Sequence, residues 1–380
     1  MSTTHGGKSV PDDVSGDRLR RLTLFAAILA LQFAIFEVAL RTWGSSEAAP
    51  AFQGLFENDP VLGYRLKPGA NTRFATDEFD TEIRINSAGL RDDEELGEKP
   101  PTERRILILG DSLVLSVQVP FGQTFGELLE RRLNSRGSPV RYRVINGGVQ
   151  GYGPVQELLL LRSLLPVVKP DLIIETLFVG NDIEDAVGAE PLLEPRQRPM
   201  TDTVREATIT RLRRIVRSSM VLQVLRLRVL TATQRFTRTA GPPEPPLQSY
   251  AAHPAPRIDR GLAIIHRVMQ QMQQEGSAAG ARTAVMLMPA RFQVNDEDYG
   301  HLRDAVRQSG GTLVRDAAGE RIDQALRDIP VQRLDVLPPL RAAGADVFFQ
   351  RTVHLTPLGH EIVAEALDRF LRESRLLDGL

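Results

Sequence analysis

The spacing of apolar and polar residues changes from one part of this 380-residue chain to the next. From Arg104 onward, short apolar runs alternate with longer segments in which apolar residues return every three or four positions. Four runs predict buried strands and a fifth is a weaker candidate: RILILG, YRVINGG, DLIIETLFVGND, TAVMLMPA and TLVRDA. The segments between them, and TPLGHEIVAEALDRFLRES near the C-terminus, predict amphipathic helices. This alternation predicts an α/β fold with a parallel sheet covered by helices on both faces.

A continuous apolar segment lies near the N-terminus. The residues from Leu22 to Leu40 are almost all apolar, and the run is about long enough to cross a bilayer as a helix. Arginines are denser before the run than after it, so the positive-inside rule places the N-terminus in the cytoplasm. We therefore expect a cytoplasmic tail at 1–21, a single-pass transmembrane anchor at 22–40 in the inner (cell) membrane, and a periplasmic or otherwise extracytoplasmic main domain. The alternatives are a cleaved signal peptide ending near SSEAAPA and a buried core helix.

Residues 52–101 have a different pattern, in which Gly and Pro separate short strand-like runs. The run TEIRIN alternates polar and apolar positions, as a half-buried strand does. We predict a small β-rich lead-in that packs against the main domain, which then spans 104–380. No set of catalytic residues stands out in the lead-in, so its expected role is structural.

A basic segment interrupts the alternation of strands and helices between 201 and 246. Its residues 205–238 place apolar side chains on one helical face with arginines dense around it, as in RLRRIVRSSMVLQVLRLRVL. A basic amphipathic helix can lie on an anionic lipid surface. The other interpretation is an insertion that packs on the domain with a solvated arginine face.

Composition and charge narrow the classes of function. Lys and Arg total 47 against 48 Asp and Glu, so the net charge of −1 gives no indication of nucleic-acid binding. The chain has no cysteine, which excludes disulfides, Cys-ligated zinc and a thiol nucleophile. No metal-ligand spacing is apparent and no phosphate-binding Gly-rich loop follows the first strand, so we expect neither a metal nor another cofactor.

Polar residues follow the first three predicted strands at the points where those strands end. The three groups are Gly110-Asp111-Ser112, Asn146-Gly147-Gly148 and Gly180-Asn181-Asp182. Because the carboxyl ends of parallel strands share one edge of a sheet, these groups are expected to converge.

Nucleophilic acyl chemistry needs a serine, a base and donors for the developing oxyanion. Ser112 is the candidate nucleophile, because it stands where a strand becomes a helix. The candidate oxyanion donors are the N–H groups of Ser112 and Gly148 and the side-chain amide of Asn181. Among the histidines, His354 precedes the last helix and is placed to reach over the sheet edge as general base, whereas His360 is more consistent with a structural role.

These residues together resemble the SGNH (GDSL) hydrolase superfamily. The blocks RILILGDS, INGGVQGYG, FVGND and HLTPLGHEIVAEAL stand in that family's order, and DPVLGYRLKPG is similar to the lead-in of membrane-anchored members. The resemblance implies a flavodoxin-like three-layer sandwich. It also implies Ser112 as nucleophile, Gly148 and Asn181 as oxyanion donors, and His354 as base.

The chain departs from the family at one place. The family usually has an Asp two or three residues before the histidine, where this chain has Thr352 and Arg351, and Asp346 lies further upstream. Such a carboxylate fixes the histidine tautomer and stabilises the imidazolium. Three explanations are open: a backbone carbonyl orients His354 in a Ser–His dyad, an acid comes from elsewhere in the chain, or catalysis is weak or lost.

The sequence therefore favours a membrane-anchored serine hydrolase that cleaves esters outside the cytoplasm. Its expected substrate is an acylated small molecule or polysaccharide, with acetyl esters on an envelope or secreted polysaccharide as the first choice. An O-acyltransferase would use the same residues with a sugar hydroxyl in place of water. A third hypothesis is a non-catalytic, glycan-binding scaffold subunit, for which the missing Asp is the main argument.

Overall fold

The computed structural model describes residues 54–137, 139–193 and 247–379, together with Gln32. The predicted tail at 1–21, the rest of the predicted anchor at 22–40 and the basic insertion at 201–246 lie outside the described residues. Among the residues that are described, no helix is both long and apolar enough to cross a membrane.

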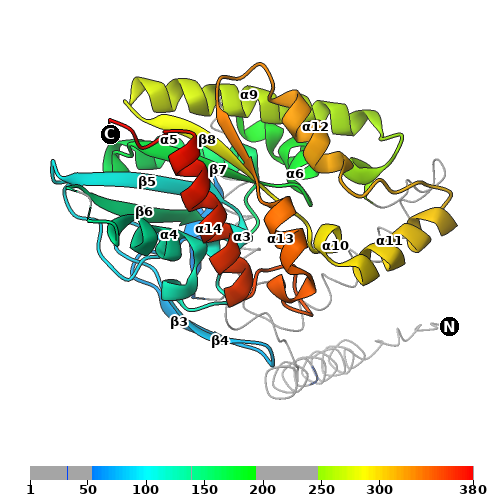
Figure 1. The fold of residues 1–380 in the computed structure, drawn as a ribbon, viewed down its shortest axis with the longest axis horizontal. Helices are drawn as coiled ribbons and strands as arrows, with labels where there is room; N and C mark the ends of the chain where they lie inside the picture. Colours follow the sequence, from blue (N-terminus) through cyan, green and yellow to red (C-terminus); the bar gives the residue numbers. More distant parts are fainter. Residues whose placement is uncertain (1–31, 33–53, 138, 194–246, 380) are drawn as a thin grey trace, which may run out of the picture. The chain divides into compact units, whose positions relative to one another are not determined.

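A five-stranded parallel sheet forms the centre of the described domain (Figure 1). Its strands are β5 (Glu103–Gly110), β6 (Arg141–Gly148), β7 (Leu172–Phe178), β8 (Arg282–Met288) and β9 (Gln332–Asp335). Their order across the sheet, β6-β5-β7-β8-β9, is that of flavodoxin-like folds. The predicted α/β class is therefore confirmed. In this topology ligands bind at the carboxyl ends of the strands where the order reverses, which here lies between β5 and β7.

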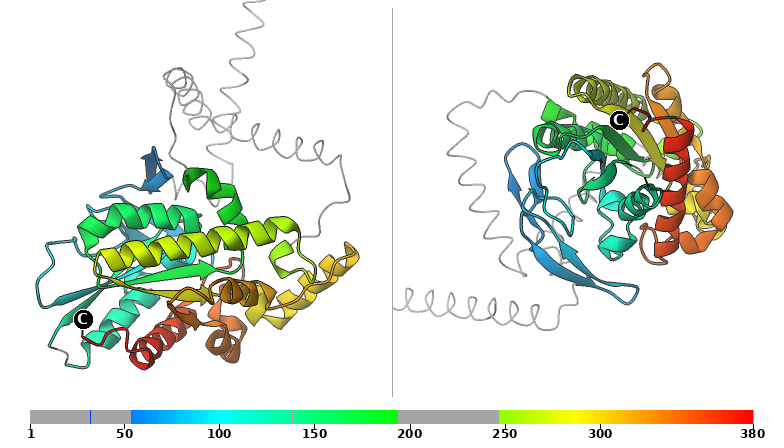
Figure 2. Two further views of the ribbon diagram at one scale, coloured as in Figure 1. Left: turned by 90° about the horizontal axis from the view of Figure 1, so that it is seen from above. Right: turned by 60° about the vertical axis from the view of Figure 1, so that its left-hand side comes forward.

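Helices cover both faces of the sheet (Figure 2). One layer contains α5 (Pro154–Val168), α6 (Asp182–Ala189) and α9 (Pro256–Ala278), and the other contains α4 (Phe125–Asn134) and α14 (Pro357–Glu373). Thr356 caps α14 by accepting a hydrogen bond from the Gly359 N–H at 3.3 Å, and Pro357 follows at the first helical position. The apolar runs predicted as strands are buried on both sides, as strands between two helical layers must be.

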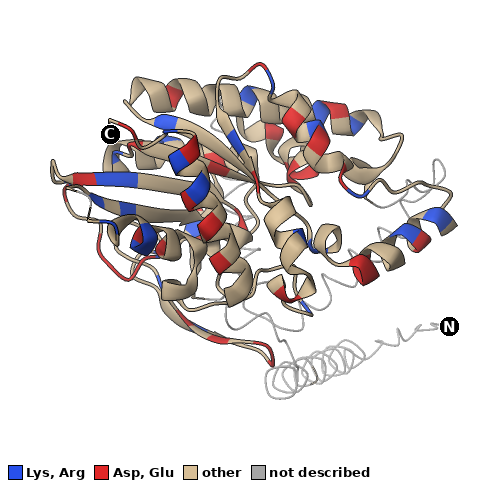
Figure 3. Ribbon diagram, viewed as in Figure 1, with Lys and Arg blue, Asp and Glu red and all other residues tan. Residues whose placement is uncertain are grey.

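The remaining helices lie along the carboxyl edge of the sheet and in the connections. They are α3 (Ser112–Leu115), α10 (Arg291–Val294), α11 (Asp296–Gln308), α12 (Ala317–Ala325) and α13 (Leu337–Ala343). Four short 3₁₀ helices accompany them among the described residues, at Phe121–Gln123, Glu190–Leu193, Gln248–Tyr250 and Ala345–Val347. Lys and Arg alternate with Asp and Glu over the outer helices (Figure 3).

The prediction of a fifth strand at TLVRDA is wrong. Leu313 in this run makes only an isolated antiparallel bridge to Ala251, and α12 begins at Ala317. The fifth strand is instead β9, which pairs with β8 at the edge of the sheet. Its residues are only partly buried or exposed, so they lack the apolar run that marks the inner strands.

The segment before the sheet contains two antiparallel strand pairs. They are β1 (Phe56–Asp59) with β2 (Gly63–Leu66), and β3 (Asn71–Ala75) with β4 (Asp80–Arg84). In β4 every second side chain is buried, which is the alternation that TEIRIN predicted. The domain boundaries at 52–101 and 104–380 stay predictions.

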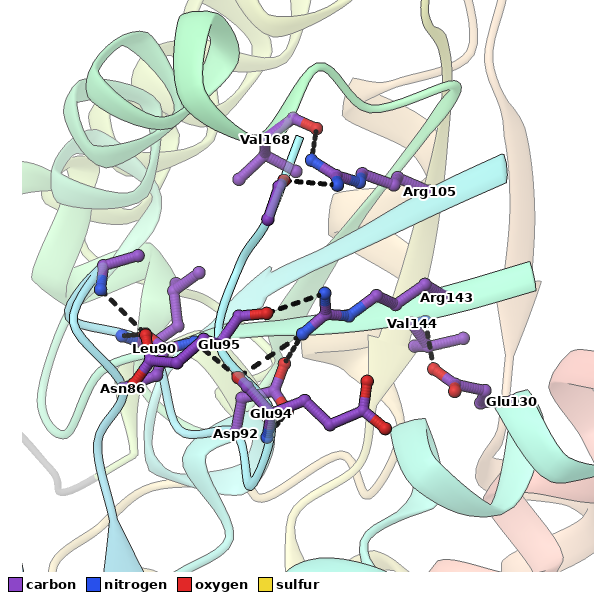
Figure 4. Close-up of polar contacts among 12 residues, drawn as sticks. Asn86, Leu90, Asp92, Glu94, Glu95, Arg105, Glu130, Arg143, Val144 and Val168 are labelled. Carbon is purple, nitrogen blue, oxygen red and sulfur yellow. Dashed lines mark hydrogen bonds and ion pairs between the residues drawn. The ribbon is translucent and has the colours of Figure 1, made fainter. Parts of the chain in front are cut away.

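Two buried arginines of the sheet fasten the segment that follows β4 (Figure 4). Arg105 of β5 donates to the carbonyls of Gly97 at 2.8 Å and Val168 at 3.0 Å. Arg143 of β6 pairs with Asp92 at 3.0 Å and donates to the Glu95 carbonyl at 3.1 Å. These charge-assisted bonds fix the lead-in on the sheet.

Candidate active site

Ser112 lies at the carboxyl end of β5, next to the point where the strand order reverses. The Asp111 side chain caps the short helix α3 by accepting a hydrogen bond from the Leu113 N–H at 2.8 Å. Asp111 is thus the helix cap, and Ser112 is the first helical residue with 8% of its surface exposed. The hydroxyl of Ser112 is free of capping and available for chemistry.

His354 meets Ser112 across 242 residues of sequence. Its Nε2 lies 2.9 Å from the Ser112 Oγ, within hydrogen-bond distance. Burial lowers the pKa of His354 to about 4, so the imidazole is neutral at pH 7. A neutral imidazole at this distance can accept the serine proton if Nδ1 carries the ring hydrogen.

No carboxylate of the described residues binds the second ring nitrogen of His354. Nδ1 is buried and has no hydrogen-bond partner within the described part of the chain. Arg351 points away to an ion pair with Asp77, and the Thr352 Oγ1 accepts a hydrogen bond from the His354 backbone N–H at 3.3 Å. Asp346 is exposed, and its carbonyl accepts a hydrogen bond from Thr356. Within the described ranges, the arrangement is therefore a Ser–His pair without a third member.

The predicted donor Gly148 is engaged elsewhere. Its N–H donates to the Asn146 Oδ1 at 2.9 Å, and Asn146 in turn donates to the Val114 carbonyl at 2.7 Å. A side chain at 148 would come within 2.2 Å of the Leu115 backbone nitrogen, so glycine is needed for β6 to approach α3. The close approach gives Gly148 a packing role, and its role as oxyanion donor stays a prediction.

The predicted donor Asn181 precedes α6 at the carboxyl end of β7. Its Nδ2 donates to the Asp185 Oδ2 at 2.7 Å, and its Oδ1 is buried without a hydrogen-bond partner among the described residues. An amide nitrogen has two hydrogens, so one stays available to a ligand. Asn181 makes no hydrogen bond to Ser112.

Sequence reasoning missed Gly151, which lies in the turn after β6. Within the described residues its N–H makes no hydrogen bond, in contrast to the N–H of Gly148. The signal that could have found it is the glycine-rich text INGGVQGYG, which offers more than one glycine at this strand end. Gly151 is exposed, and the nearest side-chain atom to its Cβ position is the Tyr64 hydroxyl at 3.1 Å.

Sequence reasoning also missed a group of buried carboxyls behind Ser112. Glu157 of α5, Glu175 of β7 and Asp182 of α6 are fully buried, and Asp111 nearly so. Burial raises the pKa of Asp111 to about 6 and that of Glu175 to about 7. Burial and then the charge of the nearby Glu175 raise the pKa of Glu157 well above its ordinary value. At neutral pH the group keeps protons that exposed carboxyls would lose.

His360 has a structural contact. Its Nδ1 accepts a hydrogen bond from the Phe125 N–H at 3.2 Å, and the two rings stack at 5.6 Å. Burial lowers its pKa to about 3, so it stays neutral. No group of three or more His, Asp or Glu side chains suited to a metal ion occurs among the described residues.

Different parts of this chain are similar to known proteins. Residues 247–380 match the family model described as "SGNH hydrolase-like domain, acetyltransferase AlgX". The resemblance to SGNH hydrolases is confirmed. The matched SGNH hydrolase-like segment contains His354, whereas Ser112, Gly148 and Asn181 lie before it.

A curated relative is the "Probable alginate O-acetylase AlgJ" of Pseudomonas putida. It is 28% identical over 124 residues, which are 32% of this chain and 29% of that protein. The chain therefore spans less than a third of the length of that relative.

The chain also matches solved structures at low sequence identity, and esterases are among them. TesA is 15% identical and covers 71% of this chain and 99% of its own, with a TM-score of 0.37. The esterase EstA from Pseudoalteromonas sp. is 14% identical and covers 72% and 98%, with a TM-score of 0.38. The acetyl xylan esterase AlAXEase is 12% identical and covers 69% and 97%, with a TM-score of 0.38.

Proposed function

We propose that this protein is a serine enzyme of acyl-ester chemistry, with Ser112 as nucleophile and His354 as general base. The observation that carries the proposal is the 2.9 Å distance between the His354 Nε2 and the Ser112 Oγ. The neutral imidazole, whose pKa burial lowers to about 4, supports the base role. The SGNH hydrolase-like match of the C-terminal third supports the same chemistry.

The reaction proceeds in two halves. The Ser112 Oγ attacks the acyl carbonyl while the His354 Nε2 accepts its proton, and the collapse of the intermediate gives that proton to the departing alcohol. Water then attacks the acyl-serine, loses a proton to His354, and the acid leaves as Ser112 regains its proton. Because no described carboxylate reaches Nδ1 to stabilise the imidazolium that forms, we expect slower turnover than in a full triad.

The oxyanion is proposed to bind the Ser112 N–H and the free hydrogen of the Asn181 amide. Gly148 contributes a third donor only after its N–H leaves the Asn146 side chain. Each such donor is worth on the order of 10²–10³ in kcat.

The proposed substrate is an acetyl ester on a polysaccharide. The relation to an alginate O-acetylase supports this class.

Acetyl transfer to a sugar hydroxyl is the second candidate. The matched family model is described as an acetyltransferase and the relative as an O-acetylase, which favours it. The same dyad serves both reactions, because a sugar hydroxyl replaces water in the second half. Incubation of an acetyl donor with a neutral oligosaccharide, followed by mass spectrometry, separates acetylated sugar from free acetate.

The central test removes the two members of the dyad. Ser112→Ala and His354→Ala should each abolish hydrolysis of a short-chain aryl ester and labelling by a fluorophosphonate. Ser116→Ala is the matched control, because this serine is buried four residues later and its hydroxyl donates to the Leu113 carbonyl at 2.6 Å. Undiminished activity of Ser112→Ala would refute the nucleophile. A wild-type chain that neither reacts nor labels would favour the non-catalytic scaffold.

The proposed location is outside the cytoplasm, with residues 22–40 as a single-pass anchor. The apolar run and its arginine-rich N-terminal flank support this orientation. In the same proposal the basic segment 205–238 contacts anionic lipid. Protease treatment of intact and lysed spheroplasts tests the orientation, since an outward-facing domain is digested before lysis.

A further inference from the structure

The loop that carries His354 is held at its tip by the lead-in. Phe349 donates its N–H to the His354 carbonyl at 3.0 Å, which closes a tight loop over the residues between them. The Glu78 carboxylate accepts the Gln350 N–H at 2.8 Å and the Arg351 N–H at 3.1 Å. One carboxylate from a distant part of the chain thus binds two consecutive backbone donors of this loop.

Glu78 is itself held in place by the turn between β3 and β4. The Thr76 Oγ1 accepts the N–H groups of Glu78 at 3.1 Å and Phe79 at 3.3 Å, a turn motif that fixes the backbone locally. The Phe79 ring lies 5.4 Å from the Phe349 ring and 5.2 Å from Phe74. The tip of this hairpin carries acidic residues, visible in Figure 3, and its aromatic side packs on the loop.

The backbone carbonyls of the same loop are bound by a second side chain, Arg291. Arg291 of α10 donates to the carbonyls of Phe349 at 3.1 Å and Gln350, and lies 3.5 Å from that of Thr352. The Arg291 Nε also pairs with Asp298 at 2.7 Å. The loop therefore lies between an acceptor that binds its N–H groups and a donor that binds its carbonyls.

The same lead-in also holds the chain after Ser112. The Thr81 hydroxyl of β4 donates to the Val117 carbonyl at 2.5 Å. The buried Arg91 donates to the carbonyls of Leu115 and Val119, each at 2.7 Å. Both members of the dyad are thus attached to one module that precedes them in sequence.

We propose that Glu78 is a positioning residue for His354, which replaces the orienting function of the carboxylate that SGNH hydrolases carry before their histidine. It acts on the loop backbone and leaves Nδ1 untouched, which agrees with the unpartnered, buried state of that atom. The inference rests on the proposed function of His354 as base. It assigns a catalytic consequence to the lead-in, whose expected role was structural only.

The experiment compares Glu78→Ala and Glu78→Gln with Asp80→Asn in the full-length chain. Asp80 pairs with Arg73 on the same hairpin, both side chains are exposed, and neither contacts the His354 loop. The Ala variant removes both acceptors, whereas the Gln variant keeps one neutral oxygen. The readouts are kcat and KM for an aryl ester across pH, and the titration of the His354 imidazole by NMR.

Glu78→Ala is expected to lower kcat by about ten-fold to a hundred-fold with KM nearly unchanged, because misplacement of a base by about 1 Å has that effect. A loosened loop also exposes the imidazole, so its titration moves from about pH 4 toward 6.5. The other charged side chains around the loop are Asp77, Arg291 and Arg351, and the Glu78 variants leave all three in the sequence. Glu78→Gln should lie between the Ala variant and wild type, and Asp80→Asn should match wild type.

Two results would overturn the inference. One is a wild-type kcat and His354 titration in both Glu78 variants. The other is an equal change in Asp80→Asn, which would make the effect one of hairpin stability. The NMR titration does not need turnover, so it decides the position of His354 even where the ester assay fails. Conversely, an active chain insensitive to Glu78 leaves the proposed function standing.

Discussion

The buried carboxyl pair of Glu157 and Glu175 predicts an unusual dependence of stability on pH. Burial raises the pKa of Glu175 from 4.5 to about 7, and that of Glu157 rises above its ordinary range from burial and from Glu175. A carboxyl with a raised folded-state pKa binds more protons when folded, so the free energy of unfolding falls as pH rises from 4.5 to the folded-state pKa. A folded-state pKa of about 7 for Glu175 corresponds to about 3 kcal/mol of stability lost over that interval.

The perturbation is Glu157→Gln. The amide is neutral at every pH and can donate to Glu175, so it stabilises the ionised form of its neighbour. At pH 5 both wild-type carboxyls are protonated when folded, and we expect the variant to lie within about 1 kcal/mol of wild type. At pH 9 it should be more stable by about 1–3 kcal/mol, because Glu157 no longer needs a proton to stay buried.

The assay is urea unfolding followed by circular dichroism at pH 5, 7 and 9. Glu365→Gln is the control, since this exposed carboxyl pairs only with Arg369 on the same helix and should give a curve parallel to wild type. Burial lowers the pKa values of His354 and His360, so they make the free energy of unfolding fall as pH drops below 6.5. This effect is the same in wild type and in both variants. A stability difference that is constant with pH, or largest at pH 5, would refute the reasoning.

Three further predictions concern the site. The value of kcat/KM for an aryl ester should be constant from about pH 8 to 5 and halve near pH 4, because burial lowers the pKa of His354 to about 4; a midpoint near 6.5 would contradict this. Gly148→Ala should lower the free energy of unfolding by about 1–3 kcal/mol, because the new Cβ would lie 2.2 Å from the Leu115 nitrogen, whereas Gly122→Ala in open space should leave the melting temperature unchanged. Asn181→Ala should lower kcat by about 10²-fold or more with little change in melting temperature, and an unchanged kcat would remove Asn181 from the oxyanion donors.

The inner strands and the long helices could be predicted from the sequence because their apolar residues follow a clear period. RILILG and TAVMLMPA became β5 and β8, and the C-terminal amphipathic run became α14. The edge strand β9 could not be predicted in this way, since an edge strand buries too few side chains to show a pattern. Short helices such as α12 and α13 were missed for a related reason, because each presents only one or two buried turns.

The pairing of Ser112 with His354 could be predicted because Ser112 ends a buried strand, His354 precedes the last helix, and both stand in the order of the SGNH blocks. The contact of Glu78 with the His354 loop could not be predicted, because Glu78 is one carboxylate among many and lies 272 residues before its partner. The hydrogen bond of the Gly148 N–H could not be predicted either, since its acceptor is the side chain of Asn146, two residues earlier. Periodicity shows which face of an element is buried, but it does not show which of several acceptors a backbone donor will bind.

The distance in sequence between Ser112 and His354 has a consequence for folding. We expect the contacts that close 242 and 272 residues of chain to form late, because the loop-closure entropy must be overcome before they stabilise the fold. During synthesis the lead-in and the nucleophile emerge long before the base, so a nascent or truncated chain holds the serine without its histidine. Esterolytic competence should therefore appear only with the last folding step, after the final helix docks, and it can report complete folding of this protein.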